Sequence, residues 1–203
     1  MRRLFEIGGL AAGVILIAFG IGSLVLSVQG KSTVKDSLSQ EKIVGSPDMT
    51  PDAIAAEAKE AGLTDVDVPD CSVAGDQIDT GSEARCFADY MRIHALEATG
   101  GKTYAEMPRF ATEDGKGTND AAQAQKDENG QPVSNAARDL WVTETALATA
   151  LNTSYMADQL GNFGIVVGIA LILAGAGFII LALGGALRRA ETAATTPAPA
   201  SRA

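Results

Sequence analysis

The chain has 203 residues, of which 25 are acidic, 16 are basic and one is histidine, so its formal net charge is −9. A single histidine excludes a multi-histidine metal centre, and the acidic balance argues against the basic surface of a nucleic-acid-binding protein. The charges are unevenly distributed. Residues 30–161 hold 23 of the acidic and 11 of the basic side chains, whereas residues 7–28 and 163–187 hold none.

The two uncharged stretches predict transmembrane helices, because about 20 apolar residues cross the ~30 Å hydrocarbon core at ~1.5 Å per residue. The first stretch follows Arg2 and Arg3, and it fits either an uncleaved signal anchor or a cleaved signal sequence. Its length and the lack of a small-residue cleavage site favour the anchor. The second stretch ends at Arg188 and Arg189.

The arginines beside both stretches predict the orientation, because positively charged flanks remain in the cytoplasm. The acidic middle segment is then extracytoplasmic, and both termini are cytoplasmic at the cell membrane. The predicted organisation is a cytoplasmic N-terminus at 1–6, spans at 7–28 and 163–187, an extracytoplasmic helical domain at 29–162, and a disordered cytoplasmic tail at 188–203.

Cys71 and Cys86 both lie in the exported segment, which favours a disulfide over two free thiols. The bridge would close a loop of about 15 residues and contribute roughly 3 kcal/mol. The segment is rich in alanine and poor in larger apolar side chains. We therefore expect it to depend on the disulfide, on its membrane anchors or on a partner chain.

The first soluble elements are predicted from capping residues. Residues 30–44 form a connector with helical character, and Thr50 caps a helix that starts at Pro51 and stops at Gly62. Residues 65–70 are predicted to be an extended connector rather than a strand of a sheet.

Ser82 is predicted to open the best soluble helix, at residues 83–99. A short capped turn follows at Thr103–Glu106, then a polar surface excursion at residues 111–133. Ser134 is predicted to cap a last helix that continues into the second span. One apolar stripe on helix 83–99 comprises Phe87, Tyr90, Met91, His94 and Ala98.

Two segments carry a resemblance to a known group of proteins: CFADYMRIHALEATGGKTYAEMPRFATEDGKGTNDAAQA and NAARDLWVTETALATALNTSYM. They resemble small two-span membrane proteins of actinobacteria and their relatives, over residues 33–183. The resemblance implies topology but no mechanism, since the function of this group is uncharacterised. Some members carry an automatic label of aromatic ring-opening dioxygenase.

The residue composition argues against a dioxygenase, because non-haem iron oxygenases need two histidines and a carboxylate around the iron. His94 is the only histidine in the chain. We interpret His94 as a half-buried, hydrogen-bonded core residue, with a pH-sensing role as the alternative. The sequence predicts no catalytic residue, no cofactor and no metal ligand, and hence a protein that is not an enzyme.

The polar excursion gathers acids that could bind calcium, which prefers six to eight oxygen ligands. The EF-hand pattern needs glycine at the sixth position of its loop, and counted from Asp114 that position is Asn119. The pattern therefore fails. We interpret the loop as a solvated surface, with cation binding as the alternative. Its acidic residues are Glu113, Asp114, Asp120, Asp127 and Glu128.

Small residues mark one face of each span, at Gly9 and Gly13 and at Gly164 and Gly168. Such residues let helix backbones approach closely, either between the two spans or toward a second copy or another membrane protein. Neither span has an internal ionisable residue, which argues against a transporter or channel.

The predicted fold is mainly α, with two transmembrane helices flanking a small helical extracytoplasmic domain with one disulfide. The predicted role is a non-enzymatic scaffold or accessory subunit of a cell-envelope complex. Its expected partners are the lipid bilayer, a second copy or another membrane protein. An envelope sensor that binds a cation or a small ligand is the alternative, and a dioxygenase subunit is the least favoured reading.

Overall fold

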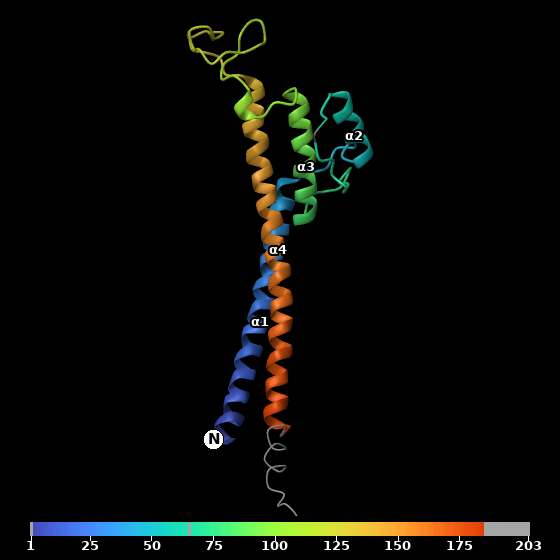
Figure 1. The fold of residues 1–203 in the computed structure, drawn as a ribbon, viewed down its shortest axis with the longest axis vertical. Helices are drawn as coiled ribbons and strands as arrows, with labels where there is room; N and C mark the ends of the chain where they lie inside the picture. The colour runs from blue at the N-terminus through green and yellow to red at the C-terminus, as the bar shows by residue number, and fades with distance from the viewer. Residues whose placement is uncertain (1, 65, 185–203) are drawn as a thin grey trace, which may run out of the picture. The chain divides into compact units, whose positions relative to one another are not determined.

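Helices account for most of the computed structural model, which describes residues 2–64 and 66–184 (Figure 1). This confirms a mainly helical fold, and two of the helices are long and apolar enough to span a membrane. Residues 185–187 of the second predicted span and the tail at 188–203 lie outside the described residues. The described α-helices are α1 (Arg2–Glu41), α2 (Pro51–Glu60), α3 (Gly81–Ala98) and α4 (Ala136–Leu183), with a 3-10 turn at Tyr104–Glu106.

The chain divides into two compact units. The first, which comprises described residues 2–31 and 160–184, is called the membrane unit because its helices are long and apolar enough to span a membrane. The second, the head unit, comprises residues 32–64 and 66–159. Helices α1 and α4 each contribute to both units, because neither is interrupted at the division. The head unit also holds α2, α3 and the 3-10 turn.

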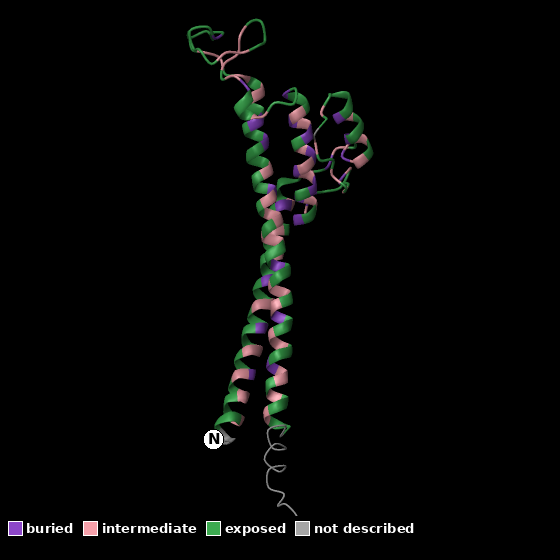
Figure 2. Ribbon diagram, viewed as in Figure 1, coloured by how far each residue is buried: buried purple, intermediate pink, exposed green. Residues whose placement is uncertain are grey.

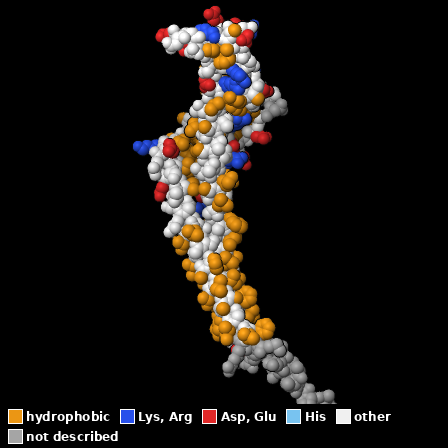
Figure 3. All heavy atoms as spheres, turned by 90° about the vertical axis from the view of Figure 1, so that its left-hand side faces the viewer, with side chains coloured by type: hydrophobic (Ala, Val, Ile, Leu, Met, Phe, Trp, Pro, Cys, Tyr) orange, Lys and Arg blue, Asp and Glu red, His pale blue; other side chains and the backbone are white. Residues whose placement is uncertain are grey.

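The buried residues of the membrane unit recur at intervals of seven residues. Figure 2 shows them in purple on both helices. Large apolar side chains such as Phe19 and Phe178 are instead exposed, and hydrophobic side chains cover the visible face of this unit in Figure 3. A seven-residue repeat keeps one side of each helix toward the other helix. The buried seam of the described residues is Gly13, Gly20 and Ser27 on α1, and Gly161, Gly168 and Gly175 on α4.

The seam glycines permit backbone contact between the antiparallel helices. A Cβ added at Gly20 would lie 2.7 Å from the carbonyl oxygen of Gly168, and one at Gly168 would lie 2.8 Å from that of Gly20. In the same way, a Cβ added at Gly13 would lie 2.7 Å from the carbonyl oxygen of Gly175, and one at Gly175 would lie 2.6 Å from that of Gly13. A larger side chain at any of these positions would push the two helices apart.

Two other predicted helix-packing residues, Gly9 and Gly164, also face the opposite helix. A Cβ at Gly9 would lie 3.2 Å from that of Ala182, and the Ser23 hydroxyl donates a hydrogen bond to the Gly164 carbonyl at 2.8 Å. Within this chain, the glycine faces of the two spans therefore contact each other. The sequence had left open whether they serve this pairing or a separate protein.

Gly20→Leu is expected to separate the helices, whereas Gly22→Leu is not, because a Cβ at Gly22 meets nothing within 4 Å. The pairing can be measured in membranes with the substitutions Gly9→Cys and Ala182→Cys, whose Cβ atoms lie close enough for a disulfide. Oxidation should link positions 9 and 182 in the Gly22→Leu background and fail in the Gly20→Leu background, as read by peptide mass mapping. Equal linkage in both backgrounds would contradict the seam.

Capping residues set the helix starts in the head unit. Thr50 caps α2 by accepting a hydrogen bond from the Ala53 N–H at 3.3 Å, as predicted. The predicted cap of α3 at Ser82 is wrong. Thr80 caps α3, because Glu83 stands three residues later and the two residues bond each other's backbone N–H groups at 2.9 and 3.2 Å.

The predicted cap of α4 at Ser134 is also wrong, by one residue. Asn135 accepts a hydrogen bond from the Ala137 N–H at 3.2 Å, and its amide donates to the Pro108 carbonyl at 2.9 Å. The second bond orients the side chain, which favours Asn135 over its neighbour. The prediction that the helix continues through Gly161 into the span is confirmed.

The core of the head unit surrounds α3. Its fully buried large side chains are Tyr90, Ile54, Ile78 and Val73. Of the predicted stripe, only Tyr90 is fully buried: Phe87, Met91 and His94 are half-buried and Ala98 is exposed. The stripe prediction was therefore only partly right, because buried residues also lie on the side of α3 that faces α2.

A disulfide and a hydrogen bond tie α3 to the segment before it. Cys71 and Cys86 are bonded, with Cα atoms 6.2 Å apart. The Tyr90 hydroxyl donates to the Cys71 carbonyl at 2.6 Å, and burial raises the pKa of Tyr90. The two bonds fix residue 71 against neighbouring turns of α3.

Replacing both cysteines with serine is expected to lower the free energy of unfolding by about 3 kcal/mol, because the bridge closes a loop of about 15 residues. Urea unfolding of the full chain in detergent, followed by Trp141 fluorescence, measures the loss. Reductant should destabilise the wild type to the same extent and leave the double variant unchanged. An unaltered midpoint in the double variant would refute the expectation.

Candidate functional site

Two cavities open between α3 and α4 in the head unit, and α1 also lines the larger one. Both cavities are lined by Met91 and Leu147. The larger has a volume of about 660 Å³, and the smaller about 560 Å³. The larger is lined by Ser37, Leu38, Glu41, Ile43, Phe87, Met91, Leu147, Ala150, Leu151 and Ser154. The smaller is lined by Met91, His94, Ala95, Ala98, Leu140, Thr143, Glu144 and Leu147.

Both cavities have mainly apolar walls that remain accessible from outside. Leu147 is 48% exposed and Leu140 is 42% exposed, although each lines a cavity. Leu38 and Leu151, at the back of the larger cavity, are buried. The walls are therefore set by core residues, while the rim exposes apolar side chains.

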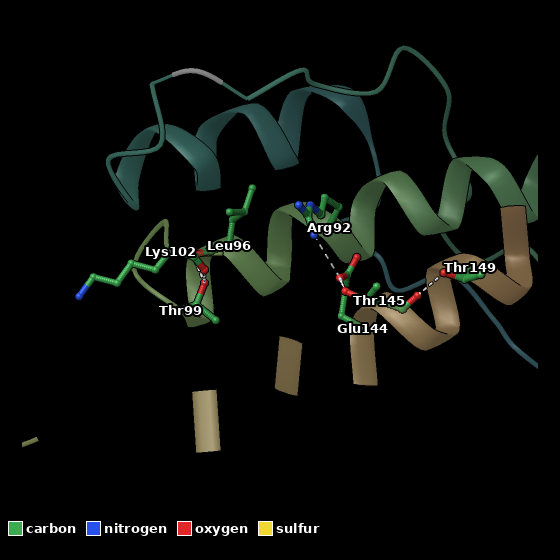
Figure 4. Close-up of polar contacts among 7 residues, drawn as sticks. All are labelled: Arg92, Leu96, Thr99, Lys102, Glu144, Thr145 and Thr149. Atoms are coloured by element: carbon green, nitrogen blue, oxygen red, sulfur yellow. Dashed lines mark hydrogen bonds and ion pairs between the residues drawn. The ribbon is translucent and has the colours of Figure 1, made fainter. Parts of the chain in front are cut away.

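A buried charge beside the smaller cavity joins α3 to α4. Figure 4 shows Arg92 of α3 and Glu144 of α4 pointing toward each other, at 3.4 Å. The Glu144 side chain is 5% exposed and that of Arg92 is 45% exposed. The Arg92 guanidinium also lies 3.9 Å from the centroid of the Trp141 ring. The Arg92 side chain thus neutralises the buried Glu144 carboxylate and stacks on the ring of Trp141. Both of these partners belong to α4.

Further hydrogen bonds lie on both helices near this ion pair (Figure 4). The Thr145 hydroxyl donates to Glu144 Oε2 at 3.2 Å, and Thr149 donates to the Thr145 carbonyl at 2.7 Å. At the end of α3, Thr99 donates to the Lys102 carbonyl at 2.7 Å. The Thr145 hydroxyl therefore helps to orient the Glu144 carboxylate.

Arg92→Met is expected to lower the free energy of unfolding by about 2 kcal/mol, because it leaves a buried carboxylate without its counter-charge. The matched control is Arg85→Met, which removes an exposed i,i+4 pair with Asp89 and should cost less than about 1 kcal/mol. Adding Glu144→Gln to Arg92→Met should recover part of the loss. Equal losses for Arg92→Met and Arg85→Met in urea unfolding would show that the buried pair has no special role.

His94 faces two carboxylates. Its Nε2 atom lies 3.3 Å from Asp48 Oδ2 and 3.6 Å from Glu57 Oε2. The residue is half-buried, as predicted, but Nε2 itself is buried and makes no hydrogen bond. The prediction of a hydrogen-bonded core histidine was therefore wrong for this atom.

Asp48 is held as a carboxylate. A hydrogen bond from Ser46 is the main cause that lowers the pKa of Asp48, with smaller contributions from a backbone N–H and the charge of His94, and together they outweigh burial. Its Oδ1 atom is buried without a hydrogen-bond partner. Asp48, Glu57 and His94 form the one group of three metal-ligating side chains found among the described residues.

The acidic loop is arranged differently. Asp114 accepts hydrogen bonds from the Thr112 hydroxyl at 2.6 Å and the Lys116 N–H at 3.2 Å, and these two bonds lower its pKa. Asp127 accepts from the N–H groups of Asn129 and Gln131 at 2.9 and 2.7 Å. These carboxylates cap local turns. This arrangement fits the solvated surface that we predicted, and cation binding by the loop stays a prediction.

Sequence reasoning missed the group around His94 for a physical reason. Asp48 lies in a turn, Glu57 on α2 and His94 on α3, so no spacing along the chain connects them. Only the packing of α2 against α3 brings the three side chains together. A motif defined by residue spacing detects metal ligands that lie on one helix, strand or loop. Here each of the three side chains comes from a different segment of the chain.

The fold and the site define a class: a mainly helical protein with two helices that could span a membrane and a disulfide-bridged head unit. Comparison of the chain with protein-family models, curated proteins and solved structures finds no match.

Proposed function

We propose that the protein crosses a membrane twice, with residues 29–162 extracytoplasmic and both termini in the cytoplasm. Two helices long and apolar enough to span a bilayer support the crossing. Arg2 and Arg188 are among the flanking arginines that support the orientation. The Cys71–Cys86 bridge supports an oxidising compartment for the head unit, because disulfides persist outside the cytoplasm.

In this proposal the head unit is a non-enzymatic interaction module, acting as a scaffold or accessory subunit of a cell-envelope complex. The observation that carries the function is the apolar surface with two cavities between α3 and α4. From Leu140 to Leu151 this surface follows α4 for about 16 Å, or three helical turns. That length suits an apolar helix of another envelope protein, which would fill the cavities with its side chains.

A second candidate function is an envelope sensor that binds a cation. The close approach of Asp48, Glu57 and His94 favours it. The acidic loop that first suggested a cation contributes little support, because its carboxylates bond within their own turns.

Leu147→Glu is expected to abolish partner binding, because it places a charge in the walls of both cavities. The matched control is Val142→Glu, at a residue of α4 that is 52% exposed and lines neither of them. Crosslinking of the full chain in native membranes, followed by mass spectrometry, should recover one consistent partner from the wild type and from Val142→Glu, and lose it from Leu147→Glu.

The crosslinked peptides should map to α3 and α4. Recovery of the wild type as a lone monomer would refute the interaction function. Equal crosslinking of the two glutamate variants would place the partner on another surface.

A further inference from the structure

We infer that Asp48, Glu57 and His94 form a zinc-binding site in the head unit. Their ligand atoms all lie within 4.8 Å of one another, and they come from three separate segments of the chain. This inference deepens the second candidate function by naming the metal. His94 also lines the smaller cavity between α3 and α4, whereas Asp48 and Glu57 line neither cavity.

The distances between the ligand atoms fit a tetrahedral ion. Zinc binds imidazole nitrogen and carboxylate oxygen at ~2.0–2.2 Å, so two ligand atoms of a tetrahedron are separated by about 3.3–3.6 Å. His94 Nε2 lies 3.3 Å from Asp48 Oδ2 and 3.6 Å from Glu57 Oε2. Two edges of a zinc tetrahedron are thus already present.

The hydrogen bonding of His94 also favours a metal over a simple ion pair. A protonated imidazole has a single Nε2–H, which can point at only one of two carboxylates. Here Nε2 is buried and makes no hydrogen bond with either. A metal ion would accept the Nε2 lone pair and attract both carboxylates at once. Asp48 Oδ1, also buried without a partner, is a further oxygen available to the ion.

The ligands are held by a supported framework. Next to Asp48, the Met49 carbonyl accepts hydrogen bonds from the Val73 N–H at 3.2 Å and the Ser72 hydroxyl at 3.3 Å. Glu57 lies on α2 beside the buried residues Ile54 and Ala58. His94 follows Tyr90 by one turn of α3. The core thus holds the backbone that carries all three residues, which reduces the entropy lost when a metal binds.

The ligand set selects zinc over the common hard cations. Calcium takes six to eight oxygen ligands, and magnesium retains most of its waters, so neither gains from an imidazole. Zinc accepts nitrogen and oxygen ligands together, and three protein ligands leave a fourth position for water or for a group from a partner.

The test uses the full chain in detergent, freed of metal with a chelator and then titrated with ZnCl2. The wild type should bind one zinc ion per chain, and its thermal unfolding temperature should rise. His94→Gln should weaken zinc binding by about 100-fold, because it removes one of three ligands. Glu57→Gln should also weaken binding, and its site on the surface of α2 makes misfolding a minor concern.

Glu60→Gln is the matched control, since Glu60 is an exposed residue of the same helix outside the group. It should bind zinc like the wild type. X-ray absorption at the zinc edge should show imidazole scattering in the wild type and not in His94→Gln. The site is refuted by the absence of zinc binding, by equal affinity in wild type and His94→Gln at matched circular dichroism, or by stronger binding of CaCl2 than of ZnCl2. Each of these results leaves the crosslinking outcome for Leu147 unaffected, so the two proposals fail separately.

Discussion

The head unit depends on the junction at which Cys71 is bonded to Cys86 and hydrogen-bonded to Tyr90. Few large side chains are fully buried in this unit, so hydrophobic burial alone contributes only modestly to its stability. The junction fixes the start of residues 71–78 against α3. That segment supplies the buried Val73 and Ile78, and its backbone binds the turn that carries Asp48. The core of the unit and the position of Asp48 both follow from this one constraint.

A different constraint governs the membrane unit. Lipid chains are as apolar as leucine side chains, so burial of apolar surface does not drive two helices together within a bilayer. Two helices in a bilayer are instead held together by close packing and by hydrogen bonds between them. The seam meets both needs, because opposed glycines such as Gly20 and Gly168 bring backbones into contact and Ser23 donates a hydrogen bond across the pair. The larger side chains are left to face outward, where lipid would contact them (Figure 3).

Local signals predicted the elements well and their limits less well. Apolar runs predicted both long helices, and Thr50 with Pro51 predicted the start of α2. The caps of α3 and α4 were misplaced by one or two residues, because neighbouring polar side chains compete for the same role. At Thr80 the competition is decided by Glu83, and at Asn135 by a bond to the distant Pro108 carbonyl. Glycines four residues apart were predicted to pack, whereas the buried glycines are seven residues apart, and their burial depends on the opposite helix.

The sequence by itself determined the mainly helical fold, the two helices able to span a membrane, and the two cysteines available for a bridge. Each of these features follows from the composition or periodicity of a short stretch, so it depends only on residues that are close together in the chain. The tertiary structure decided which glycines face each other, that Arg92 neutralises Glu144, and that Asp48 and Glu57 approach His94. These contacts join residues far apart in the chain. Their distances are set by how helices pack, and the charge pattern that reveals the spans carries no information about that packing.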